Sequence, residues 1–112
     1  MNCIFCKIAA GEIPATFAHR DDDVIAITDV NPQAPQHLLV LPVRHAANLP
    51  ELAGAGENDL IAKLFATAAQ LGREVSSDGF RLVVNTGELG GQTVDHVHIH
   101  VLGGRPMQWP PG

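Results

Sequence analysis

Three histidines alternate with aliphatic residues near the C-terminus, in the run His96-Val97-His98-Ile99-His100. Alternation is the period of a β-strand, so the three imidazole rings are predicted to share one face of a strand. Burying three such polar rings without partners would cost on the order of 1–3 kcal/mol for each ring. The rings are therefore expected to line a solvated cleft, bind a metal or contact a ligand. Histidine also titrates near neutral pH, which favours a function over a merely polar outer face of an edge strand.

The loop before the histidines contains Gly87, Gly90 and Gly91, followed by Gln92 and Thr93. Glycine lets a backbone approach a ligand closely, and successive N–H groups in such a loop can cradle a phosphate. The last two residues add side-chain donors. The segment is not a Walker loop, because no Gly-Lys-Ser/Thr follows it. Most glycine-rich turns are only turns, but the position directly before the histidines indicates a phosphate-binding role.

Cys3 and Cys6 have the spacing of paired zinc ligands, although one such pair is only half of a zinc site. The alternative is two reduced, partly buried thiols, because cysteine is often just a small hydrophobic residue. A dithiol redox role is less favoured, since no thioredoxin-like βαβ pattern surrounds the pair. Two cysteines so close together fit a reducing compartment better than a disulfide framework.

Length and charge limit the classes of function. A chain of 112 residues is predicted to form a single domain, residues 1–112, and its hydrophobic fraction of 46% fits a globular protein. The net charge is −5 and the seven basic residues form no run, which argues against nucleic acid as the main partner. Because no apolar run of membrane-spanning length and no basic-then-apolar leader occurs, we expect a cytoplasmic protein without a membrane partner.

The elements that must position these residues follow an α+β pattern. A short helix over residues 4–10 is stopped by Gly11, and Asn58 is a suitable N-cap for an amphipathic helix over residues 58–75. Strands are predicted at residues 16–20, 24–29, 37–41, 80–85 and 96–102, with loops at 31–36 and 86–93. Since the strands arrive in runs with one long helix between them, we expect an antiparallel sheet of about five strands with that helix on one face.

The histidine run resembles the signature of the histidine triad (HIT) superfamily, His-x-His-x-His followed by apolar residues. Further segments resemble its nucleotide-binding branch, and together they cover almost the whole chain: residues 3–8, 12–14, 29–37, 90–93 and the tail 103–112, which ends in Trp-Pro-Pro-Gly. The resemblance implies a HIT-like fold paired across a homodimer. A small sheet with an exposed edge strand gains from such pairing.

The resemblance also implies roles for four histidines. His98 is similar to the nucleophile that attacks the α-phosphorus of a nucleotide and becomes transiently nucleotidylated, a step that suits a neutral imidazole. His100 is similar to the residue that contacts the phosphate and the leaving group. His96 would orient the central ring, and His37 matches the fourth histidine of the family site.

The remaining implied contacts surround the nucleotide. The N–H groups of Gly91 to Thr93, with Gln92 between them, and the Thr93 hydroxyl would hold phosphate oxygens. Asn85 corresponds to a polar residue near the phosphate, and Asp29 resembles the carboxylate that accepts both ribose hydroxyls. The resemblance places Trp109 near the partner subunit's site. An apolar slot for the base is formed by Phe5, Ile8, Ile13, Ile27 and Leu39.

Each of these assignments has a plain structural alternative. Any one of the slot residues taken alone is more often core. Asp29 is equally suited to a turn before Asn-Pro. Asn85 could end a strand, His37 could be a satisfied core histidine, and Trp109 could simply anchor the tail. His19 has no such neighbours and is interpreted as a surface residue.

Some bacterial histidine triad proteins with this N-terminal cysteine pattern complete the metal site with two histidines. In this chain they would be His45, after the third strand, and His96, the first triad histidine. The resemblance therefore implies a structural zinc held by Cys3, Cys6, His45 and His96, whereas catalysis would need no cofactor.

The implied activity is hydrolysis of purine nucleoside phosphoramidates through a nucleotidyl intermediate on His98, releasing a nucleoside 5′-monophosphate and an amine. Nucleotidyltransferases of the superfamily carry glutamine where this chain has His100. Dinucleoside polyphosphate hydrolases share the triad but usually lack the Trp-Pro-Pro-Gly ending, and they stand as the enzymatic alternative. A nucleotide-binding regulatory or scaffold protein with incidental activity is a further alternative. The physiological amine and the choice between adenine and guanine stay open, since apolar slots discriminate weakly.

Overall fold

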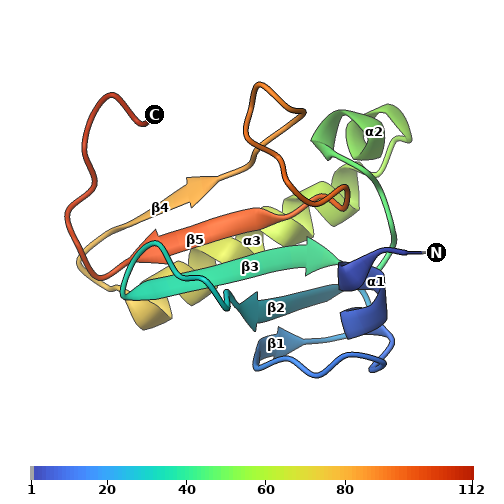
Figure 1. Ribbon diagram of the computed structural model, residues 1–112, viewed down its shortest axis with the longest axis horizontal. Helices are drawn as coiled ribbons and strands as arrows, with labels where there is room; N and C mark the ends of the chain where they lie inside the picture. The colour runs from blue at the N-terminus through green and yellow to red at the C-terminus, as the bar shows by residue number, and fades with distance from the viewer. Residues whose placement is uncertain (1) are drawn as a thin grey trace.

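The computed structural model describes residues 2–112. Five strands form one sheet in the order β1-β2-β3-β5-β4, and every neighbouring pair is antiparallel, which confirms the predicted α+β architecture. None of the helices in these described residues has the length and hydrophobicity needed to cross a membrane. In chain order the elements are α1 (Ile4–Ala9), β1 (Phe17–Arg20), β2 (Val24–Thr28), β3 (Gln36–Pro42), α2 (Leu49–Gly54), α3 (Asn58–Val75), β4 (Phe80–Val83) and β5 (Ile99–Gly103) (Figure 1).

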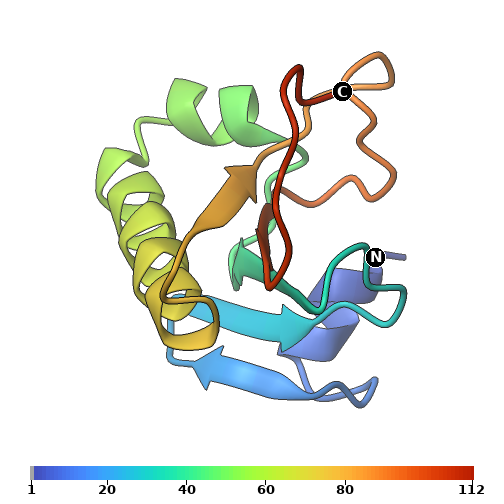
Figure 2. The same ribbon diagram turned by 90° about the vertical axis from the view of Figure 1, so that its left-hand side faces the viewer.

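Helix α3 covers one face of the sheet and α1 lies against the other (Figure 2). Val97, Ile99 and Val101 are each at most 2% exposed and pack in the core beneath α3, against Leu64 and Leu71. Burying an aliphatic side chain of this size stabilises the fold by about 1.5–3 kcal/mol. Because alternate residues face opposite sides of a strand, this aliphatic set directs the three histidines to the α1 side.

The histidine strand is shorter than predicted. Strand β5 begins at Ile99, so residues 96–98 lie outside the sheet ladder, and the Val97 N–H donates instead to the Ala46 carbonyl at 2.8 Å. The alternate facing still extends through residues 96–98, since Val97 is buried in the core beneath α3. The other predicted elements agree with the observed bounds to within two residues.

The sequence reasoning missed α2 and misplaced the cap of α3. Asn48 is the N-cap of α2 and accepts the Glu51 N–H at 2.9 Å, while the Glu51 carboxylate accepts the Ala47 N–H. This reciprocal capping is readable from sequence, but the helix is only six residues long, too short for an apolar period to show. At α3 the N-cap position is Glu57, and Asn58 is already helical, so the predicted cap role of Asn58 is wrong.

Candidate active site

A cavity of about 980 Å³ opens on the α1 side of the sheet. It lies between α1, the strands β2 and β3, the loop that joins them and the segment before β5. The five residues predicted to form an apolar slot all line it, namely Phe5, Ile8, Ile13, Ile27 and Leu39. The same wall contains four residues predicted to act on phosphate or ribose, namely Asp29, Thr93, His98 and His100, together with His37, the predicted fourth histidine of the site. The fold thus brings together polar and apolar candidates that are far apart in the sequence.

The cavity wall also contains residues that sequence reasoning did not select. Ile4 of α1 and Val30, Asn31 and Gln33 of the loop between β2 and β3 line it. Val30 is fully exposed and Ile4 is 47% exposed, so both present apolar surface to solvent at this wall. An aliphatic residue in an otherwise polar, proline-bearing loop is the sequence signal that could have identified Val30.

Four predicted ligand contacts lie outside the cavity wall in the described chain: Asn85, Gly91, Gln92 and Trp109. The Gln92 side chain is engaged by the protein itself, because its Nε2 donates to the Ala47 carbonyl at 2.6 Å. Nε2 also donates to the Val94 carbonyl at 3.0 Å, so both hydrogens of this amide are used within the protein. The N–H groups of Gly91 and Gln92 donate to the carbonyls of Glu88 and Gly87, which corrects the predicted phosphate-binding role of these donors. Gly91 has a φ of 83°, a conformation that glycine adopts readily. Trp109 is 83% exposed within the chain.

His98 is held in one tautomer by the backbone. Its Nδ1 lies 2.7 Å from the carbonyl oxygen of His96. A carbonyl can only accept, so Nδ1 carries a hydrogen, and in the neutral imidazole the lone pair is then on Nε2. The edge contact between the His98 and Phe5 rings, with centroids 5.2 Å apart, further restricts the imidazole. His98 is only 6% exposed, and the result is an imidazole of fixed orientation at the cavity wall.

The other two cavity histidines form a hydrogen-bonded pair of fixed direction. The Gln33 N–H donates to Nδ1 of His37 at 3.0 Å, so the hydrogen of His37 is on Nε2. That Nε2 lies 2.9 Å from Nδ1 of His100, which must accept, and the hydrogen of His100 is therefore on its own Nε2. His100 consequently presents a donor, whereas His98 presents an acceptor. Their ring centroids are 4.9 Å apart.

Burial keeps both rings of this pair uncharged. Desolvation lowers the pKa of His37, against the opposing charge of Asp29, whose Oδ2 is 3.4 Å from Nε2 of His37. Desolvation, with smaller effects of His98 and His37, lowers the pKa of His100 to about 4. Both imidazoles are therefore neutral at neutral pH, as the hydrogen-bond directions also require. Asp29, His37 and His100 lie close enough to hold a metal, but the hydrogen on Nε2 of His37 blocks that nitrogen as a ligand.

A second cluster of donor atoms lies where α1 meets the chain before β5. One atom each from Cys3, Cys6, His45 and His96 falls within 4.8 Å of the others. The closest separations are 3.2 Å between the two histidine Nδ1 atoms, 3.3 Å from Cys3 Sγ to His96 Nδ1 and 3.4 Å from Cys6 Sγ to His45 Nδ1. A tetrahedral zinc with sulfur and nitrogen ligands has edges of about 3.3–3.8 Å. The predicted set fits such an ion in both type and spacing.

The protonation of this cluster also suits a metal. His96 Nε2 donates to the Pro42 carbonyl at 2.8 Å, so the lone pair of His96 is on Nδ1, the atom that faces the thiols. Burial raises the pKa of the Cys6 thiol to about 11, so its thiolate form needs a cation close by. The His96 ring belongs to this cluster and not to the cavity wall. The predicted orienting role of His96 is therefore exercised by its backbone carbonyl.

A sheet with this histidine run and this cavity defines a histidine triad protein, and the family comparison agrees. The HIT domain model matches residues 10–107, so the chain belongs to the HIT domain family. The chain is 49% identical over 112 residues to an uncharacterized HIT-like protein of Synechococcus elongatus, covering 99% of this chain and 97% of that one.

Solved structures agree with the fold. A HIT family hydrolase from Legionella pneumophila is 47% identical with a TM-score of 0.94, over 99% of this chain and 100% of that one. A zinc-bound histidine triad family protein from Mycobacterium smegmatis is 30% identical with a TM-score of 0.85, over 94% of this chain and 76% of that one.

Proposed function

We propose that this HIT domain protein is a hydrolase that cleaves the phosphorus–nitrogen bond of purine nucleoside phosphoramidates. The products are a nucleoside 5′-monophosphate and an amine. The observation that carries the proposal is the geometry of His98, a ring at the cavity wall whose Nδ1 hydrogen is held by a carbonyl, which leaves Nε2 as the nitrogen that can attack. The Legionella relative, described as a HIT family hydrolase, supports the general class of reaction. The chemical steps need no cofactor.

In the first step, the Nε2 lone pair of His98 forms a bond to phosphorus while the bond from phosphorus to the leaving nitrogen breaks. The leaving nitrogen takes up one proton from solvent and departs as an amine. A neutral imidazole suits this step because no proton blocks its lone pair. The Nε2 hydrogen of His100 and the Thr93 hydroxyl are donors at the same wall, and they stabilise the charge that builds on the phosphate oxygens.

In the second step, water attacks the phosphorus of the nucleotidyl-histidine. The bond between phosphorus and Nε2 breaks, and its electron pair returns to His98. One proton of the attacking water goes to solvent, which balances the proton taken up in the first step. The net reaction adds one water across the phosphorus–nitrogen bond.

The nucleoside is held by the rest of the cavity. Asp29 Oδ1 already accepts the Asn31 N–H at 2.8 Å, and the Asp29 side chain is 18% exposed. An ionised carboxylate has about four acceptor sites, so lone pairs are left for two ribose hydroxyls. The apolar wall then encloses the base, where flat stacking tolerates either purine.

A panel of substrates tests this proposal. Adenosine and guanosine 5′-phosphoramidates are assayed beside a dinucleoside polyphosphate, with wild-type protein and with His19→Ala as a control for loss of a histidine outside the cavity wall. The proposal expects faster turnover of the phosphoramidates by both proteins. Faster cleavage of the polyphosphate would instead favour the dinucleoside polyphosphate hydrolase, and AMP binding without turnover would favour a scaffold.

A structural zinc in the cluster of Cys3, Cys6, His45 and His96 is part of the same proposal. The types and close spacing of the four donor atoms support it, as does the zinc-bound Mycobacterium relative. With all four positions filled by protein, the ion would serve as a crosslink between α1 and the chain before β5. A reducing, cytoplasmic location would keep both thiols available. Metal analysis of the purified protein is the direct test, and protein without zinc would contradict this part.

Pairing of two subunits is the last part of the proposal. Strand β4 lies at an edge of the sheet, and its residues are only partly buried within one chain. A second copy could cover this edge and extend the sheet. Sedimentation equilibrium is expected to give the mass of a dimer, and a monomer at micromolar concentration would contradict it.

A further inference from the structure

The tautomers of the cavity pair depend on one residue of the loop between β2 and β3. Gln33 donates its N–H to Nδ1 of His37, and this is the contact that sets the direction of the whole pair. Without that donor, Nδ1 of His37 could carry the hydrogen, and His37 would then accept from His100. The Nε2 hydrogen of His100 would be lost. The position of the Gln33 backbone therefore determines which nitrogen of His37 and of His100 carries the hydrogen.

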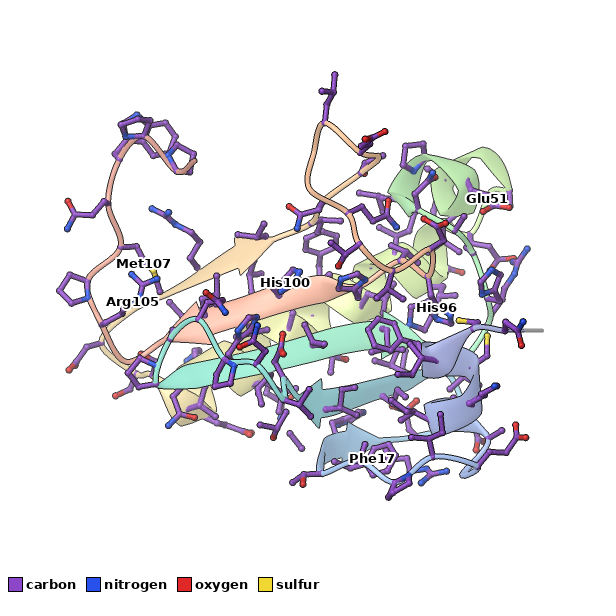
Figure 3. The ribbon with its side chains drawn as sticks, in the orientation of Figure 1. Phe17, Glu51, His96, His100, Arg105 and Met107 are labelled. Atoms are coloured by element: carbon purple, nitrogen blue, oxygen red, sulfur yellow. The ribbon has the colours of Figure 1, made fainter. Side chains whose placement is uncertain are left out.

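The C-terminal tail holds this residue in place. Arg105 donates to the Gln33 carbonyl twice, from Nε at 3.2 Å and from Nη2 at 3.1 Å, and its Nη1 donates to the Pro106 carbonyl at 3.1 Å. Its neighbour Gly104 lies so close to Pro35 that an added Cβ would approach the proline Cβ at 2.9 Å. Arg105 lies beyond the end of β5, next to the loop that leads into β3 (Figure 3). Tail and loop are thus joined by a two-pronged contact and by close packing.

We infer that Arg105 is a positioning residue: by holding Gln33 it keeps the Gln33 N–H on His37 and so keeps the hydrogen of His100 on Nε2. The inference deepens the proposed function, on which it rests for the use that His100 makes of that hydrogen. The guanidinium makes no contact with substrate in this account. It acts through the carbonyl and the N–H of Gln33, and then through the imidazoles of His37 and His100.

The first test reads the tautomers directly. In protein labelled with ¹⁵N-histidine, NMR distinguishes ring nitrogens that carry hydrogen from those that do not. The expected result is hydrogen on Nε2 alone for both His37 and His100 at neutral pH. Hydrogen on Nδ1 of either ring in the wild-type protein would overturn the inference.

The second test removes the hydrogen bond from the Gln33 N–H to His37. Gln33→Pro deletes the N–H, whereas Gln33→Ala keeps it and is the matched control for the side chain. Gln33→Pro is expected to release the His37 tautomer, and Gln33→Ala to preserve it. If Gln33→Pro is folded by circular dichroism and its tautomers are unchanged, the inference is wrong. Should that variant fail to fold, the arginine variants decide.

Arg105→Ala is expected to mix the tautomers of both histidines and to lower kcat about two- to tenfold, the worth of one hydrogen bond, with KM nearly unchanged. Arg105→Lys should restore part of the loss. The matched control is Arg81→Ala, because Arg81 also donates to a tail carbonyl, that of Gln108 at 2.8 Å, without reaching Gln33. A fall in melting temperature with unchanged tautomers would reduce Arg105 to a structural role and contradict the inference.

These readouts separate the inference from the proposed function. The wild-type tautomers could be as expected and change in Arg105→Ala while the protein turns over no phosphoramidate. The proposed function would then be wrong, and the inference about Arg105 would still hold. Turnover with the His100 hydrogen on Nδ1 would defeat the inference alone.

Discussion

The molecule holds two groups of histidines whose chemistry differs although three of them come from one alternating run. In the candidate metal cluster of Cys3, Cys6, His45 and His96, His96 donates its Nε2 hydrogen to a carbonyl and directs Nδ1 toward the two thiols. In the cavity, His98 has the reverse arrangement, because it donates its Nδ1 hydrogen to a carbonyl. His37 accepts a backbone N–H and becomes a donor. The backbone group opposite each ring thus sets which of its nitrogens donates a hydrogen and which can accept one.

The two groups also share one residue. His96 contributes its ring to the metal cluster and its carbonyl to His98, and Phe5 contacts both rings at their edges. His96 lies beside α1 in Figure 3, and His100 lies farther along the sheet. We therefore expect the groups to be chemically distinct but mechanically linked, and the predictions below separate these two properties.

The largest effect is expected from removing the nucleophile. His98→Ala should lower phosphoramidate turnover by about a thousandfold or more, because no other group can form the covalent intermediate. Zinc content should change little, since the ring is not one of the four proposed zinc ligands, whereas the melting temperature should fall modestly because a buried ring and its contact with Phe5 are lost. Parallel assays of turnover, bound metal and thermal unfolding check this. A loss of zinc along with activity would break the proposed separation of the two groups.

Disrupting the candidate metal cluster should lower metal content and stability more than it lowers turnover. Cys3→Ser is expected to lose zinc and to destabilise the fold by about 3 kcal/mol, because a crosslink near a buried imidazole is removed. Turnover at low temperature should fall far less than in His98→Ala. A chelator should lower the melting temperature of wild-type protein and leave that of Cys3→Ser unchanged. Wild-type protein indifferent to the chelator would contradict the zinc proposal.

An intermediate effect is expected from acid. The pKa of His100 is about 4 in the folded state, below the unfolded value of about 6.5. Between these two pH values, the imidazole is protonated in the unfolded chain and neutral in the folded chain. Stability should therefore fall as the pH is lowered from about 6.5 to about 4. In His100→Gln this slope should be shallower, measured as melting temperature against pH. An unchanged slope in that variant would exclude His100 as a source of the dependence.

The smallest effect tests the link between the groups. Phe5→Leu removes the ring edges that contact His96 and His98, contacts worth about 0.5–1.5 kcal/mol. We expect a modest fall in melting temperature together with a few-fold fall in kcat. Ile25→Val is the control, because Ile25 lies in the same small core but does not line the cavity. Equal effects of the two variants on kcat would mean that Phe5 acts only as core.

Much of this arrangement could be predicted from the sequence because it is periodic. The alternation at residues 96–101 predicts which side chains face the core, and the structure agrees even though β5 begins only at Ile99. The apolar stripe of α3 predicts its bounds in full. The cysteine pair suggests a metal site, and the resemblance supplied the two histidines that the fold places beside it.

The rest depends on contacts between distant residues, which no local pattern encodes. His96 owes its bare Nδ1 to Pro42, and His37 owes its donor to Gln33, which the sequence offered only as part of a proline-bearing loop. Gln92 looked like a ligand donor, but the carbonyl of Ala47, 45 residues earlier, occupies its amide. Residue types therefore predicted where chemistry would occur, and tertiary hydrogen bonds determined which chemistry each residue can do.

The most direct measurement is capture of the intermediate. Wild-type protein is mixed with labelled adenosine 5′-phosphoramidate, quenched within one turnover without exposure to acid, and mapped by mass spectrometry. The account predicts a nucleotidyl group on His98, formed and lost at rates that match turnover and absent from His98→Ala. Rapid hydrolysis without an adduct on His98, or hydrolysis that persists at the wild-type rate in His98→Ala, would contradict it.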